Sequence, residues 1–299
     1  MEGSQDGASD HLVPCTAADN LTCQIVDTLS TWNKLLVGSK LELREESATS
    51  GQLHLTRHGY KHLIGISPMD EYFDALRLPQ YPELIGWLLR THRCIASVSL
   101  KLSADEITSL SVLDALRHSS GTKTLKLYFG DMEALNAASK IIPCLTKIEE
   151  LHCTGSITNE ARPDGFIAAL SALLQASSSL RNLHLTGLHG PVAETLFTGF
   201  LLTINTLKEL YLEDSRLICD AYPHAISDYL GTTMVLTVLS FKIKHEVVQR
   251  AILDGVLRNR SIEKLSIGCF IGNDPKHGTS SCSDQREQPD SRLDHFARM

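Results

Sequence analysis

A short apolar pattern recurs seven times between residues 95 and 267, at a nearly constant spacing. Each copy places mostly apolar residues at its first, fourth and sixth positions, as in Leu180-x-x-Leu183-x-Leu185. The fourth positions are Val98, Leu125, Leu151, Leu183, Leu210, Leu239 and Leu265, at steps of 27, 26, 32, 27, 29 and 26 residues. A period of this length predicts a chain that stacks one structural unit on the next.

Each copy reads as a β-strand, and the sequence between copies has a helical period. Side chains of a strand alternate between its two faces, so the repeated apolar positions enter a core and the residues between them face away from it. Helical spacing follows, as in Phe166 and Leu170, or in Val248 and Ile252. The predicted fold class is therefore α/β: a leucine-rich repeat solenoid, or horseshoe, with a parallel sheet on its concave face and helices on its convex face.

The pattern also divides the chain into segments. Residues 1–19 are polar and are expected to be disordered, and residues 272–299 to form a flexible tail. The leucine-rich repeats occupy 95–271. Residues 20–94 contain one amphipathic helix over 20–37, a hairpin through 47–51 and a helix over 82–93, and are expected to form an N-terminal capping region, because a single repeat cannot bury its own apolar face. The alternative for 20–94 is a separate module that docks an adaptor.

Charge and hydropathy exclude some classes of partner. The net charge is -7 without any basic run, which disfavours a nucleic-acid partner, since binding phosphates requires clustered Lys and Arg. No apolar run approaches the roughly 18 residues of a membrane span, and the first twenty residues lack the apolar core of a signal peptide. We expect a protein of the cytoplasm or nucleus that has no membrane partner.

The eight cysteines are scattered and contain no Cys-x-x-Cys pair. We expect them to be reduced thiols, with Cys153 acting as a small buried hydrophobe in the repeat core. On this reading the chain has no metal site and no cofactor.

The clearest units, Leu180-Arg-Asn-Leu-His-Leu-Thr186 and Leu207-Lys-Glu-Leu-Tyr-Leu-Glu213, resemble the ribonuclease-inhibitor-like class of leucine-rich repeats. Relatives in that class include ribonuclease inhibitor, the Ran GTPase-activating proteins and the repeat regions of NOD-like receptors. The resemblance covers about 95–271. It implies a non-enzymatic scaffold that binds a protein on its concave face. The alternatives that it leaves open are a GTPase-activating regulator of a small GTPase and a substrate receptor in ubiquitin transfer.

The candidate binding residues lie between the core positions of the central strands. They are polar, mixed in charge and include two tyrosines, a composition typical of protein interfaces. They are Lys126, Tyr128, Glu150, His152, Asn182, His184, Glu209, Tyr211 and Glu213. We expect a protein partner there and no small-molecule substrate.

Two of these candidates raise a question about metal binding. His152 and His184 are expected on adjacent strands, roughly 5 Å apart. Two imidazoles are too few for a structural zinc site, so we interpret them as solvated side chains. We expect no catalytic residues, because the sequence has no Gly-x-Ser-x-Gly nucleophile turn.

Overall fold

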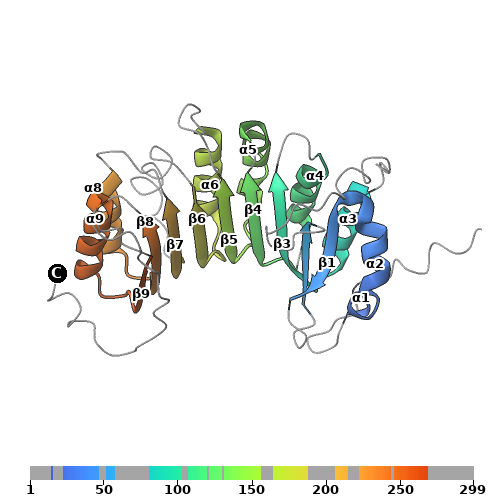
Figure 1. Cartoon of the computed structure of the whole chain (residues 1–299), viewed down its shortest axis with the longest axis horizontal. Coiled ribbons are helices and arrows are strands. Elements are labelled where there is room, and N and C mark those ends of the chain that lie inside the picture. The colour runs from blue at the N-terminus through green and yellow to red at the C-terminus, as the bar shows by residue number, and fades with distance from the viewer. Residues whose placement is uncertain are drawn as a thin grey trace, which may run out of the picture.

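The computed structural model describes residue 15 and residues 23–46, 52–57, 81–102, 107–119, 121–129, 131–155, 164–187, 206–214, 222–243 and 246–268. These residues form one nine-stranded sheet whose strands follow the order of the chain, from β1 to β9. Figure 1 shows the strands side by side along the long axis of the molecule. The fold is α/β with a mostly parallel sheet, as the repeating pattern predicted.

The strands are β1 (Leu41–Glu45), β2 (Leu53–Arg57), β3 (Ile95–Leu102), β4 (Thr124–Phe129), β5 (Glu150–Gly155), β6 (Asn182–Thr186), β7 (Glu209–Asp214), β8 (Val238–Ile243) and β9 (Lys264–Ile267). The pair β1 and β2 is antiparallel, and every later pair is parallel. The two strands expected at the start of the sheet are thus antiparallel neighbours, and the turn expected over 47–51 lies outside the described residues.

The repeated apolar positions form one continuous row across the sheet. Val98 is paired with Leu125, and each later fourth position pairs with the next, through Leu151, Leu183, Leu210 and Leu239 to Leu265. Leu55 of β2 extends the row at its N-terminal end. All of them except Leu265, which is half-buried, are buried in a single apolar core. The predicted register is therefore confirmed.

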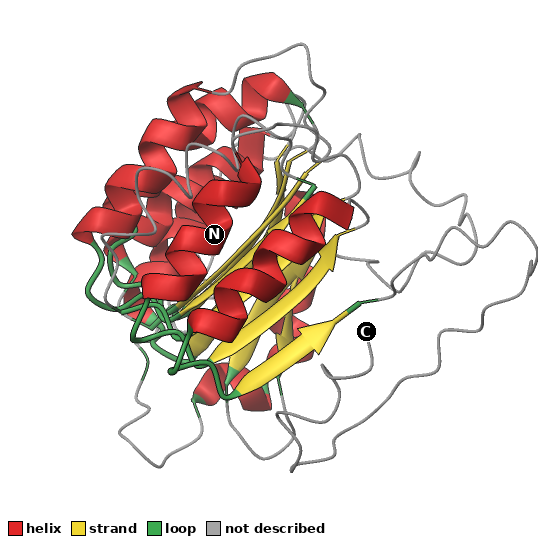
Figure 2. Cartoon of the chain, turned by 90° about the vertical axis from the view of Figure 1, so that its left-hand side faces the viewer, coloured by secondary structure: helices red, strands yellow, loops and turns green. Residues whose placement is uncertain are grey.

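Helices supply the other side of this core. They are α1 (Gln24–Asp27), α2 (Leu29–Leu36), α3 (Tyr81–Thr91), α4 (Ile107–Ala115), α5 (Met132–Ser139), α6 (Asp164–Ala176), α8 (Tyr222–Thr232) and α9 (Glu246–Arg258), with short 3-10 helices η1 (Val37–Ser39), η4 (Leu116–His118) and η5 (Ile142–Cys144). The view along the row of strands in Figure 2 shows most helices gathered on one side of the sheet. The expected inward residues Phe166, Leu170, Val248 and Ile252 are buried.

The start of each repeat strand is held in the same way. The backbone N–H of residue 123 donates to the carbonyl of residue 96, and the same bond recurs from 149 to 123, 181 to 149, 208 to 181, 237 to 208 and 263 to 237. Side chains close several of the preceding turns: Ser119 accepts from Thr122 N–H, Ser177 from Leu180 N–H, and Asn259 from Ile262 N–H. Ser119, Ser177 and Asn259 each lie three residues before the first position of the next copy of the apolar pattern.

Two details differ from the expectations. The helix over 20–37 is broken at Thr28 into α1 and α2, although Ile25, Trp32 and Leu36 are buried as the stripe predicted. On β3, Ser97 and Ser99 are buried, and Ser99 Oγ lies 2.9 Å from Nε2 of His54. Of the β3 side chains that alternate with the core positions 98, 100 and 102, only Lys101 is therefore exposed.

Some expectations lie outside the described residues. These are the expectation of disorder for 1–19, apart from Cys15, and the expectation of a flexible tail over 272–299. Of the helices that the structure describes, none has the length and apolar character needed to cross a membrane.

Candidate binding surface on the polar face of the sheet

The sheet has a core face and a polar face. The polar face consists of the side chains of β4 to β8 that alternate with the buried row. All nine residues expected to bind a partner lie on it, on strands β4 to β7, and all are half-buried. The strand register places Lys126, His152, His184 and Tyr211 in one row across four strands. Glu150, Asn182 and Glu209 form a second row beside it.

Three aromatic rings stack across the centre of this face. The His152 and His184 ring centroids are 3.9 Å apart, with 12° between the ring planes. His184 stacks in turn on Tyr211, with 5.4 Å between centroids and 28° between planes. We call these three residues the ring ladder. Its members present flat, partly apolar surfaces at the middle of an otherwise polar strip.

The ring ladder is neutral near pH 7. Burial and, to a smaller extent, the charge that His152 would carry together lower the pKa of His184 to about 4. Burial also holds the pKa of His152 below its usual value, although its hydrogen bond to Glu150 opposes that shift. Two stacked imidazolium ions would repel each other, so the neutral state of both rings is what permits their close contact.

Glu150 holds one side of the ring ladder in place. Its Oε1 lies 2.5 Å from Nε2 of His152 and 3.8 Å from Nε2 of His184, and its Oε2 accepts a 3.2 Å hydrogen bond from Thr124. Burial raises the pKa of Glu150, but the hydrogen bonds from His152 and Thr124 outweigh burial and keep it below the usual value. The group is therefore a carboxylate that accepts from the His152 ring.

A second acid fixes the other end. The Tyr211 hydroxyl donates to Glu213 Oε2 at 2.8 Å, and Lys242 Nζ lies 2.7 Å from Glu213 Oε1. The bond to Lys242 lowers the pKa of Glu213, whereas burial and the Glu213 carboxylate raise the pKa of Tyr211 to about 12. Tyr211 thus remains protonated and oriented, with its ring stacked on His184.

Lys126 lies at the β4 end of the same row. It pairs with His152 of β5, and its charge lowers the pKa values of His54, His152 and His184. No ion pair to Lys126 occurs within the described part of the chain. This cation is the natural position for an acidic group brought by another molecule.

Glu150, His152 and His184 also meet the distance requirement for a metal site, with ligand atoms within 4.8 Å of one another. A metal bound by two imidazoles must lie near the plane of each ring, on converging nitrogen lone pairs. Nearly parallel stacked rings direct their nitrogens side by side instead of toward a common point. The observed geometry is that of a stacked pair held by a carboxylate rather than a chelate.

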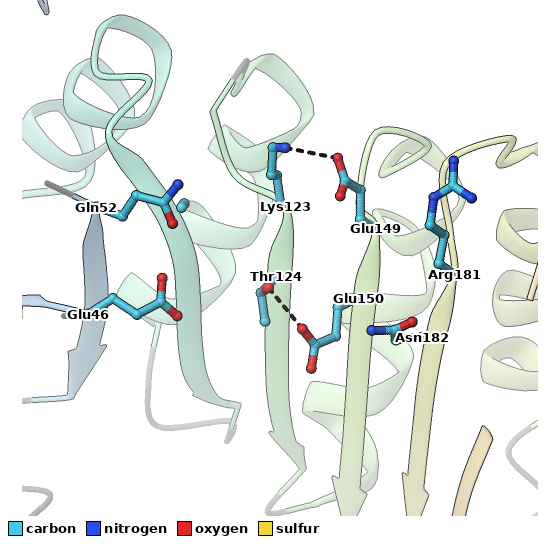
Figure 3. Close-up of a pocket in the computed structure, with 9 residues that line it drawn as sticks. Glu46, Gln52, Lys123, Thr124, Glu149, Glu150, Arg181 and Asn182 are labelled. Carbon is cyan, nitrogen blue, oxygen red and sulfur yellow. Dashed lines mark hydrogen bonds and ion pairs between the residues drawn. The ribbon is translucent and has the colours of Figure 1, made fainter. Parts of the chain in front are cut away.

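An open hollow of about 180 Å³ adjoins Glu150 at the starts of β4, β5 and β6 (Figure 3). Lys123 and Glu149 line it and form an ion pair at 3.1 Å. Asn182 is the first residue of β6 and Arg181 precedes it, while Glu46 and Gln52 flank β1 and β2. Sequence reasoning included Glu150 and Asn182 but missed Lys123, Glu149 and Arg181. These three precede their strands by one residue, and only the aligned strand starts bring them together.

Comparisons with known proteins do not identify the chain. No protein-family model matches it, and no curated protein is similar to it. Among solved structures, the chain is similar to one titled leiomodin-1 actin-binding site 2, with 16% sequence identity and a TM-score of 0.29. That match covers 65% of this chain and 92% of the other. A similarity this weak supports no argument about fold or partner.

Proposed function

We propose that this chain is a leucine-rich repeat solenoid of the horseshoe type, and that it binds a protein partner on the polar face of its sheet without catalysing a reaction. Support for the architecture comes from the single buried row and from the identical backbone bonds at successive strand starts. Stacked units of one strand and one helix are the defining feature of such arrays.

The observation that carries the binding proposal is the ring ladder. Tyrosine and other flat side chains dominate binding energy at protein interfaces because they bury a large area at low entropic cost. Here Tyr211 and His184 are already ordered by stacking and by the bond to Glu213. These two side chains lose little conformational entropy when a partner covers them, because their positions are set before binding.

The charges beside the ring ladder indicate the partner's chemistry. Lys126 can form an ion pair with an acidic group at one end, and the rings can pack against a flat or apolar group at the centre. The paired acids and bases of the hollow suit a polar rim. We therefore propose a protein segment that combines an acidic residue with an adjacent aromatic or aliphatic residue. The five described cysteines are free thiols, which suits the reducing interior of the cell, in the cytoplasm or nucleus.

The test is affinity purification with a face-specific pair of variants. Proteins captured by the wild type are compared with those captured by His184→Ala/Tyr211→Ala and by Lys264→Ala, a lysine on the same sheet but on its last strand. A true partner is lost with the double variant and kept with the control. Its measured affinity for the double variant should fall by about thirtyfold or more, the loss typical of an aromatic hot spot. Equal affinity of all three chains contradicts the proposal.

The two alternatives give different results. A GTPase-activating regulator would accelerate GTP hydrolysis by Ran when present at catalytic concentration. A substrate receptor in ubiquitin transfer would lose an adaptor, but not its polar-face partner, when residues 1–94 are altered. Either outcome would replace the scaffold proposal.

A further inference from the structure

A cluster of three thiols and one imidazole lies at the N-terminal end of the core. Its members are Cys15, Cys23, His92 and Cys94, and their ligand atoms all lie within 4.8 Å of one another. Cys15 Sγ is 3.5 Å from Cys23 Sγ, and Cys23 Sγ is 3.4 Å from Nδ1 of His92. The scattered spacing of these cysteines gave no reason to expect them together.

We infer that these four residues form a structural zinc site of the Cys₃His type. Zinc in such sites is four-coordinate and tetrahedral, at about 2.3 Å from sulfur and about 2.0 Å from nitrogen. Those bond lengths require neighbouring ligand atoms to be about 3.5–3.8 Å apart. The two distances observed here are close to the edges of that tetrahedron, so little movement would be needed to admit the ion.

The donor set is specific for a soft metal. Three thiols and one imidazole exclude the oxygen-seeking ions Mg²⁺ and Ca²⁺, and four protein ligands leave no open position for a substrate. A closed site of this composition is structural rather than catalytic. The inference is therefore about how the N-terminal region is held, and it does not depend on the binding proposal above.

The four candidate ligands are mostly buried, and aromatic side chains hold the histidine among them in place. Cys23 is 1% exposed, His92 2% and Cys94 7%, while Cys15 is half-buried and leaves a path for the ion. The His92 ring meets Trp87 edge-on at 5.1 Å, and Trp87 stacks on Trp32 at 6.1 Å. This aromatic wall fixes the ring with Nδ1 toward the sulfurs, and an apolar shell of this kind keeps water from the site.

The cluster joins segments that are distant in sequence. Cys23 is the residue before α1, and His92 and Cys94 lie in the turn between α3 and β3. The N–H of Cys15 donates to the Thr91 carbonyl at 3.4 Å, and the Cys94 carbonyl accepts from Leu53 of β2 at 2.7 Å. A metal here would fasten the Cys15 segment, α1 and the α3–β3 turn beside the first parallel strand, where the repeat core needs closure.

The experiment measures the metal content of the full chain, purified under reducing conditions from zinc-supplemented cells. We expect about one zinc ion per chain by elemental analysis. After removal of the metal, Zn²⁺ alone should rebind with a dissociation constant of about 50 nM or tighter, and chelation should lower the melting temperature. A metal-free chain that binds added Zn²⁺ only at micromolar concentration or weaker would overturn the inference.

Variants assign the ligands. Cys94→Ser should abolish zinc binding, and Cys15→Ser, at a half-buried position outside every helix and strand, should weaken it by at least a hundredfold. Cys144→Ser, at an exposed cysteine that ends η5, is the matched control and should retain full zinc content. If Cys94→Ser does not fold, Cys15→Ser decides. Unchanged zinc binding in Cys15→Ser, or a Cys15–Cys23 disulfide found by mass spectrometry of the native chain, would exclude the site.

Discussion

Leu183 and His184 are consecutive residues of β6, yet they face opposite environments. Leu183 is fully buried and pairs with Leu151 and Leu210, whereas the His184 side chain is 28% exposed and pairs with His152 and Tyr211. The same contrast holds along the sheet: leucine recurs on the core face, and a different residue appears at almost every position of the polar face.

The contrast follows from what constrains each face. On the core face, the fourth position of each repeat copy packs against the fourth positions of the two neighbouring copies. Nearly the same side chain therefore fits each time. On the polar face, neighbours interact through hydrogen bonds and ring stacking that differ from strand to strand. The repeated face determines stability, and the varied face is the one that can discriminate between partners.

The largest expected effect comes from placing a charge on the core face. Leu183→Asp buries a carboxylate without a partner, which costs several kcal/mol and should abolish cooperative unfolding. Ser240→Asp, on the polar face between Tyr211 and Ser266, is the control and should melt near the wild-type temperature. Circular dichroism melts of the two variants test the assignment of faces, and similar melts would mean that the register is wrong.

The next largest difference is expected when one side chain on each face is truncated to alanine. Leu210→Ala is expected to lower the free energy of unfolding by about 3 kcal/mol, because it removes buried contacts and leaves a cavity. Tyr211→Ala, on the other face, should cost about 1 kcal/mol through loss of its stacking and its bond to Glu213. Urea denaturation measures both values. A larger loss for Tyr211→Ala would show that the polar face also stabilises the fold.

Acid should weaken the chain through the ring ladder. The pKa of His184 is about 4 in the folded chain, below its value of about 6.5 when unfolded. Between these values the unfolded chain binds more protons, so stability falls as the pH decreases from about 6.5 to 4. His184→Gln should remove about 1 kcal/mol of this loss, after allowance for the partial exposure of the ring.

The control for this measurement is Ser240→Ala, which changes a residue of the same row without a titratable group. Its stability should follow the wild-type pH dependence throughout. His54, whose pKa is also lowered to about 4 by burial, accounts for part of the slope that remains in His184→Gln. If His184→Gln and the wild type have parallel curves, the ring is not kept neutral by the fold.

The smallest expected effect concerns the exposed end of the polar face. Lys242 is 55% exposed, and its ion pair with Glu213 is open to solvent. Lys242→Ala should therefore change the free energy of unfolding by about 0.5 kcal/mol or less. A larger change, measured by the same denaturation experiment, would mean that Lys242 is required to keep Tyr211 and Glu213 in place.

The sequence by itself determined the strands, their order and the face to which each residue belongs. A strand shifted by one residue would expose its leucines, so the alternation leaves one register for Val98 through Leu265. The same argument placed Lys126, His152, His184 and Tyr211 in one row, because their positions in the repeat unit are identical.

Only the tertiary structure determined which residues meet when they come from segments that the repeating pattern does not relate. It brought Cys15 and Cys23 to His92 and Cys94, buried Ser99 beside His54, and aligned Lys123, Glu149 and Arg181 around one hollow. Such contacts depend on loop paths and on where chain segments meet. Periodicity determines only which face a side chain joins, and side-chain distances across separate segments arise from packing alone.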